Sequence, residues 1–80
     1  MDKNEFEGKW KEIRSQSKIW WSRISDSDLS KVDKAAIKFF EYVTLLQVKY
    51  GYDRQHAKDE IIRRVTEYET SLKANTVTTP

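Results

Sequence analysis

The stretch that decides the fold is residues 24–51, which read ISDSDLSKVDKAAIKFFEYVTLLQVKYG. Its apolar residues recur every three or four positions, the spacing of an amphipathic helix; they are Leu29, Val32, Ala36, Phe39, Phe40, Val43, Leu46 and Tyr50. Ser25 followed by Asp28 is typical of a helix start, and Gly51 supplies the left-handed position that often ends a helix. Because residues 33–36 contain no helix breaker, we expect one continuous or mildly kinked helix, with a split into two helices as the alternative.

Two further helical segments flank this stretch. Residues 4–23 carry apolar residues at the same spacing; they are Phe6, Trp10, Ile13, Trp20 and Trp21. After Gly51, Asp53 is placed to cap a last helix that ends near Leu72. The polar residues 73–80 show no apolar pattern, so we expect one helical domain over residues 1–72 and a disordered tail over residues 73–80.

The pattern predicts an all-α fold, a small irregular bundle of three long helices, or four if the middle one is split. The connections near residues 24–25 and 51–52 are short and capped. Such tight corners leave little slack for laying helices side by side, so we expect helices that cross at large angles.

Composition excludes several classes of protein. The 80 residues include no cysteine, which removes disulfide frameworks, thiolate nucleophiles and zinc fingers. The acidic start of the chain and the short uncharged stretch Tyr42–Val48 predict a cytoplasmic protein without a membrane span. His56 is the single histidine, and Asp26 and Asp28 are explained by helix capping, so no metal, cofactor or catalytic residue is expected.

Several short motifs resemble the CsbD-like family, small bacterial general stress proteins. The motifs are Gly8-x-Trp10-Lys11, then Trp21, then Ile24-Ser25-Asp26-x-Asp28-Leu29, then Gln47-x-x-Tyr50-Gly51-Tyr52. The resemblance covers Phe6 to Glu69 and implies a small helical bundle with a stress-response role and no defined catalytic residues. Ser15 and Ser22 stand where the family tends to carry glycine, and the middle segment is longer than usual.

A basic row on the first helix is one candidate binding surface. Lys11, Arg14 and Lys18 lie beside Trp21 on the helical wheel. Aromatic and cationic side chains together are typical of surfaces for single-stranded nucleic acid or an acidic partner. The alternative is a core face with a solvated, cationic rim.

The middle segment is apolar around more of its circumference than one buried face requires. Phe39, Phe40 and Leu45 account for the excess. They predict either a central helix packed on two sides or a surface for a homodimer or another protein. Taken together, the sequence predicts a non-catalytic protein that is expected to be a monomer with no assigned partner; nucleic-acid binding and self-association are the alternatives.

Overall fold

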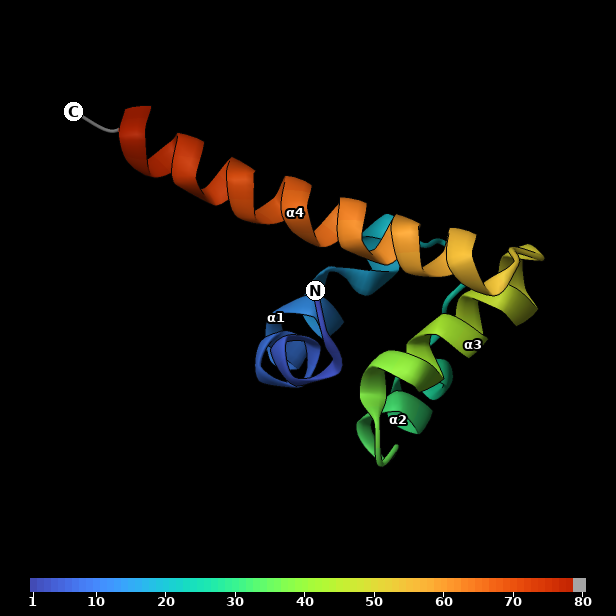
Figure 1. The fold of residues 1–80 in the computed structure, drawn as a ribbon. Helices are drawn as coiled ribbons and strands as arrows, with labels where there is room; N and C mark the ends of the chain where they lie inside the picture. Colours follow the sequence, from blue (N-terminus) through green and yellow to red (C-terminus); the bar gives the residue numbers. More distant parts are fainter. Residues whose placement is uncertain (79–80) are drawn as a thin grey trace.

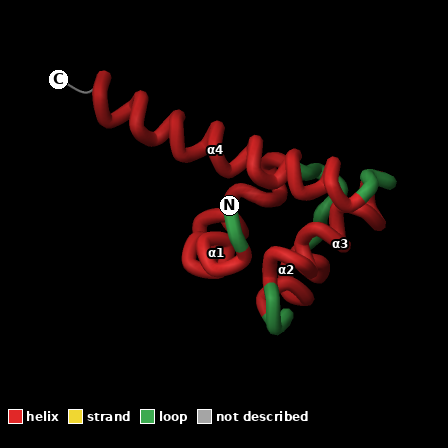
Figure 2. Tube along the Cα trace, viewed as in Figure 1, coloured by secondary structure: helices red, strands yellow, loops and turns green. Residues whose placement is uncertain are grey.

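The computed structural model describes the backbone of residues 1–78 and the side chains of residues 1–72. Four helices follow one another: α1 (Lys3–Trp20), α2 (Asp26–Asp33), α3 (Lys38–Tyr50) and α4 (Arg54–Thr78). No strand occurs in the described backbone (Figure 2). The helices cross steeply rather than lying parallel, and α3 contacts the other three (Figure 1). The predicted all-α irregular bundle is confirmed.

The first helix begins as expected and ends earlier. The Asp2 carboxylate accepts a hydrogen bond from the Glu5 backbone at 2.8 Å and caps the start of α1. Trp21, expected within the helix, has extended backbone instead (φ −133°). Its ring is buried against Tyr50 and Tyr52, at centroid distances of 5.6 and 6.4 Å. The chain leaves the helix because this turn carries the large indole into the core.

The middle segment is split, so the expectation of continuity is wrong and the four-helix alternative is confirmed. The Asp33 carboxylate accepts hydrogen bonds from Trp10 Nε1 at 2.7 Å and Arg14 Nε at 3.1 Å, which attaches the end of α2 to α1. The chain then turns through residues 34–37, and Ile37 has extended backbone before α3 begins. This turn lets both α2 and α3 direct apolar side chains toward one core.

The corner after α3 matches the prediction. Gly51 adopts φ +71°, the left-handed region that glycine enters without steric cost. Asp53 Oδ1 accepts from the His56 backbone at 2.7 Å and caps α4. α4 passes Leu72, the expected helix end, and reaches Thr78, because no glycine or proline interrupts residues 53–79. The predicted tail at residues 73–80 lies outside the residues whose side chains are described.

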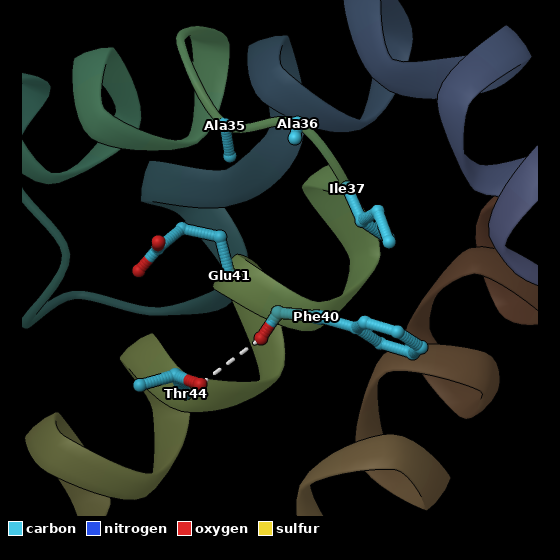
Figure 3. A pocket seen from close by; sticks show the side chains of 6 residues that line it. All are labelled: Ala35, Ala36, Ile37, Phe40, Glu41 and Thr44. Carbon is cyan, nitrogen blue, oxygen red and sulfur yellow. Dashed lines mark hydrogen bonds between the residues drawn. The ribbon is translucent and has the colours of Figure 1, made fainter.

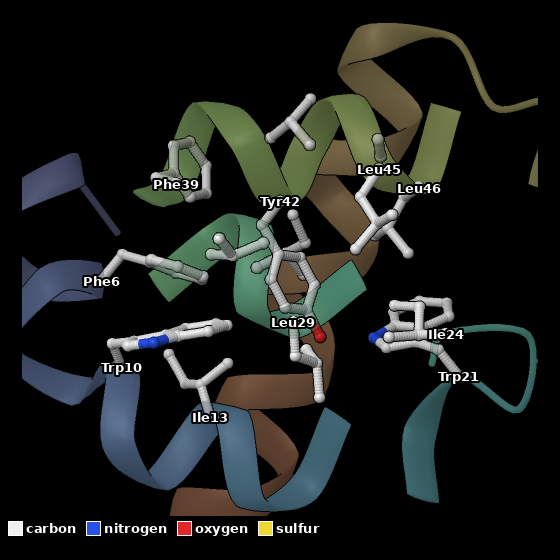
Figure 4. Packing of buried hydrophobic residues seen from close by; sticks show 14 of the residues in the cluster. Phe6, Trp10, Ile13, Trp21, Ile24, Leu29, Phe39, Tyr42, Leu45 and Leu46 are labelled. Carbon is white, nitrogen blue, oxygen red and sulfur yellow. The ribbon is translucent and has the colours of Figure 1, made fainter. Parts of the chain in front are cut away.

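Aromatic side chains from α1 and α3 form the centre of the core (Figure 4). The Phe6 ring contacts Phe39 and Tyr42 edge-on, at centroid distances of 5.3 and 5.5 Å. The buried Tyr42 hydroxyl donates to Ser17 Oγ at 2.7 Å, and Ser17 donates to the Ile13 carbonyl at 2.6 Å. Ser17 therefore satisfies a buried hydroxyl at a position where the helical stripe lacks an apolar residue. Burial raises the pKa of Tyr42 well above its ordinary value.

Candidate functional site

The strongest candidate site is the side of α3 that points away from the core. We define the outer face of α3 by five residues, Ile37, Phe40, Glu41, Thr44 and Val48. Val48 is 75% exposed and Phe40 is 41% exposed, although both are large and apolar. An open hollow of about 320 Å³ lies at the start of this face (Figure 3). It is lined by four of the five residues together with Ala35 and Ala36.

The split between α2 and α3 produces the hollow. The connecting residues include two small alanines, whose side chains lie at its rim (Figure 3). Ile37 precedes α3 without a side-chain hydrogen bond to the helix start. The Thr44 hydroxyl donates to the Phe40 carbonyl at 3.1 Å within α3. The hollow is therefore a product of the backbone turn, with mainly apolar walls.

One charge lies on each side of this apolar surface. Glu41 lines the hollow and forms no ion pair with the described side chains. On the other edge, the Arg54 guanidinium lies 5.7 Å from the centre of the Phe40 ring and donates to Gln47 Oε1 at 3.1 Å. Exposed apolar side chains beside polar and charged groups are common at protein-binding surfaces.

The residues predicted for self-association do not share one surface. Phe39 and Leu45 are buried in the core, and only Phe40 reaches the surface. Sequence reasoning did not select the exposed Val48 of α3 or the half-buried Ile37 that precedes this helix. Their helical spacing from Thr44 was the signal that could have identified them.

The predicted basic row does not assemble into one aromatic and basic surface. Arg14 pairs with Asp33 at 3.1 Å and Lys18 with Asp26 at 3.0 Å, so two of its cations already face carboxylates of α2. Lys11 is exposed and forms no ion pair among the described side chains. Trp21 is buried, and its ring is therefore not available for stacking from solvent.

A second surface, the aromatic corner, consists of Arg23, Tyr50, Tyr52 and His56. The Arg23 guanidinium lies 5.5 Å from the centre of the Tyr50 ring. Tyr50 stacks on Tyr52 at 5.7 Å, and Tyr52 contacts His56 at 4.2 Å. Arg23 donates to the Lys49 carbonyl at 3.3 Å and has no carboxylate partner among the described residues. Sequence reasoning did not place Arg23 and His56 on one surface with the tyrosines, because these contacts depend on the three-dimensional corner.

The predicted structural-motif residues mostly hold helix ends and corners together. Those that carry the CsbD-like resemblance are Trp10, Ser25, Asp26, Asp28, Leu29, Gln47, Tyr50 and Gly51, and Asp53 is the predicted helix cap. Ser25 and Asp28 form a reciprocal capping box at the start of α2. Asp28 also pairs with Lys49 at 3.2 Å. Hydrogen bonds from Ser25, together with the nearby Lys49 charge, hold the pKa of Asp28 below its usual value. Ser25 and Asp28 therefore have a structural role at the start of α2.

The described residues contain no group of three or more histidine, cysteine, aspartate or glutamate side chains placed to hold a metal ion. Among the described helices, none has the length and apolar character needed to cross a membrane.

Curated proteins with similar sequences share one family name. Over 73 residues the chain is 33% identical to a UPF0337 protein of Rhodopseudomonas palustris, covering 91% of this chain and 100% of the relative. It is 30% identical over 61 residues to one from Pectobacterium atrosepticum, covering 76% and 84%. It is 29% identical over 62 residues to UPF0337 protein YjbJ of Escherichia coli, covering 78% and 86%. No family model and no solved structure matches the chain.

Proposed function

The chain belongs to the UPF0337 family, which includes CsbD-like proteins, and on that premise we propose that it is a non-catalytic protein of the bacterial general stress response that acts by binding a protein partner. The stress role follows from the resemblance to CsbD-like proteins. We also propose a cytoplasmic location, because a chain without cysteine needs no oxidising compartment to fold. The observation that carries the binding role is the outer face of α3.

The exposed apolar residues of this face, Phe40 and Val48, lie outside the buried core cluster. The core of the described chain is already closed by buried side chains of all four helices. Exposed apolar groups that gather on one face and have polar groups at the edge mark interaction sites more often than isolated exposed residues do. Phe40 in particular is a large aromatic residue beside a hollow, the arrangement in which binding energy concentrates.

A matched pair of variants tests the binding role in cells. Val48→Glu places a charge on the outer face of α3, whereas Ile19→Glu makes the same change on α1 at nearly equal exposure, 75% against 74%. In a strain lacking the protein, we expect wild type and Ile19→Glu to restore survival of stress, and Val48→Glu to fail while remaining helical by circular dichroism. Full restoration by Val48→Glu would contradict the proposal.

The stress role has its own test. Protein levels are measured through stationary phase and after osmotic and oxidative challenge. The proposal expects a rise under at least one of these conditions. Protein levels that stay constant under all three conditions would remove the support for a stress role. The binding role would still be tested separately by the Val48→Glu and Ile19→Glu variants.

Single-stranded nucleic acid is a second candidate, favoured by the aromatic corner. The Arg23 guanidinium lies over the Tyr50 ring and has no carboxylate partner among the described residues. Cations beside aromatic rings favour stacked bases and their phosphates. A titration of tryptophan fluorescence with single-stranded DNA tests this candidate. Quenching that weakens as salt rises and is reduced by Arg23→Ala supports it; absent or salt-independent quenching excludes it.

A further inference from the structure

We infer that the outer face of α3 binds the same face of a second copy of this chain, with the two α3 helices antiparallel. This inference rests on the proposed function, since it names the partner of that same surface. In this arrangement Ile37 lies opposite the partner's Val48, and Glu41 lies opposite the partner's Thr44.

The spacing of the residues on the outer face favours this arrangement; Thr44 and Val48 are exposed, and Ile37 and Glu41 are half-buried. Ile37, Glu41, Thr44 and Val48 follow one another at intervals of four, three and four residues. At about 100° per residue Glu41, Thr44 and Val48 form one narrow stripe along α3. Ile37, whose extended backbone precedes the helix, lines the same hollow as Glu41 and Thr44. The intervals read the same from either end, so an antiparallel copy of the helix presents each residue to a counterpart. A two-fold symmetric dimer requires such self-complementarity.

The chemistry of the stripe is complementary to itself in the same register. Its two ends are apolar, so Ile37 packs against the partner's Val48, and the two-fold symmetry forms this contact twice in the dimer. Between these ends, Glu41 lies opposite the partner's Thr44 rather than opposite the other carboxylate, and the Thr44 hydroxyl keeps its hydrogen bond to the Phe40 carbonyl.

The hollow explains how the partner's side chain is received. Ala35 and Ala36 leave room beside Ile37, and the hollow opens onto the same face (Figure 3). The partner's Val48, which projects from its own helix with 75% of its surface exposed, is of a size to enter it. Each copy thus offers a projecting side chain at one end of the stripe and a recess at the other.

The size of the surface predicts a concentration-dependent dimer. From Ile37 to Val48 the stripe is about 16 Å long, from the helical rise per residue. One helix face buries less than the roughly 800 Å² per partner of a standard stable complex. The dimer is therefore expected to form when the protein accumulates and to dissociate on dilution.

Cysteine crosslinking tests both the partner and the register, and the chain offers a clean background because it contains no cysteine. Ile37→Cys and Val48→Cys proteins are treated with a short thiol-reactive crosslinker, alone and mixed. In antiparallel helices the two Val48 positions are about 16 Å apart, beyond its reach. We expect crosslinked dimers in the mixture and almost none in either protein alone. Ile19→Cys mixed with Val48→Cys measures random collision.

Sedimentation equilibrium supplies the second measurement. Val48→Glu is expected to raise the dissociation constant of the dimer at least about tenfold, and Ile19→Glu to leave it unchanged. Crosslinking of Val48→Cys alone, crosslinking no greater than the collision control, or a monomer at all concentrations overturns the inference.

The two experiments distinguish a failure of this inference from a failure of the proposed function. If wild type is monomeric but Val48→Glu still fails to restore stress survival, the face binds another protein: the dimer falls and the proposed function stands. If Val48→Glu restores survival fully, the proposed function falls whatever the oligomeric state.

Discussion

The two faces of α3 carry similar large apolar residues that differ in burial. On the inner face, Tyr42, Val43 and Leu46 are almost completely buried, and the Tyr42 hydroxyl has a hydrogen-bond partner. On the outer face, Phe40 and Val48 are exposed although they are also large and apolar. The difference shows that hydrophobicity alone does not identify a core residue: burial explains the inner face, and the outer face calls for another explanation.

The largest expected effect compares one residue from each face. Leu46→Ala removes a fully buried side chain and should lower the free energy of unfolding by about 3 kcal/mol, because it loses burial and leaves a cavity. Val48→Ala should change it by no more than about 0.5 kcal/mol. Urea denaturation of both variants measures the contrast. Equal losses would mean that Val48 belongs to the core.

The next effect concerns the polar group on the inner face. Tyr42→Phe removes the hydroxyl that donates to Ser17 and should reduce the free energy of unfolding by about 1.5 kcal/mol at neutral pH.

The same variant isolates a pH dependence. Burial raises the pKa of Tyr42, so the folded protein retains a proton that the unfolded chain releases near its ordinary value of 10.0. The stability linked to this proton is fully present below pH 10.0 and is lost as the pH rises above it. Unfolding measured on both sides of that pH should therefore show a steeper alkaline loss in wild type than in Tyr42→Phe. Parallel pH profiles would contradict this assignment.

A smaller effect is expected at Gly51, the residue at which α3 ends. Gly51→Ala should destabilise by about 1 kcal/mol, because alanine is disfavoured at φ +71°. Gly8→Ala, inside α1, should stabilise by about 0.5 kcal/mol, because alanine favours helix. Apart from the adjacent backbone, neither added Cβ would have a neighbouring atom within 4 Å, so thermal unfolding of the pair measures the effect of backbone conformation. Destabilisation by both changes would indicate hidden steric contacts.

The helices themselves could be predicted from the sequence because their signals are local. The apolar spacing, the Ser25 and Asp28 capping box and the left-handed Gly51 all act within a few residues of one another. The split after Asp33 could not be predicted in this way. Its causes, Trp10 and Arg14, are 23 and 19 residues away in the sequence.

The candidate site was predicted only in part, for a related reason. The excess of apolar residues in the middle segment was visible, but Phe39 and Leu45 turned out to face other helices. Which side of a helix remains uncovered depends on where its neighbours lie. Trp21 shows the same limit, since its burial depends on Tyr50, which is 29 positions later.

The most direct test of the contrast between the two faces is a dilution series of amide NMR spectra on the wild-type chain. The account predicts that signals of the outer face of α3, including Thr44 and Val48, shift with protein concentration, whereas that of Leu46 shifts far less. Shifts centred on α1 or α4, or spectra that do not change up to the highest concentration, would exclude self-association through the outer face of α3.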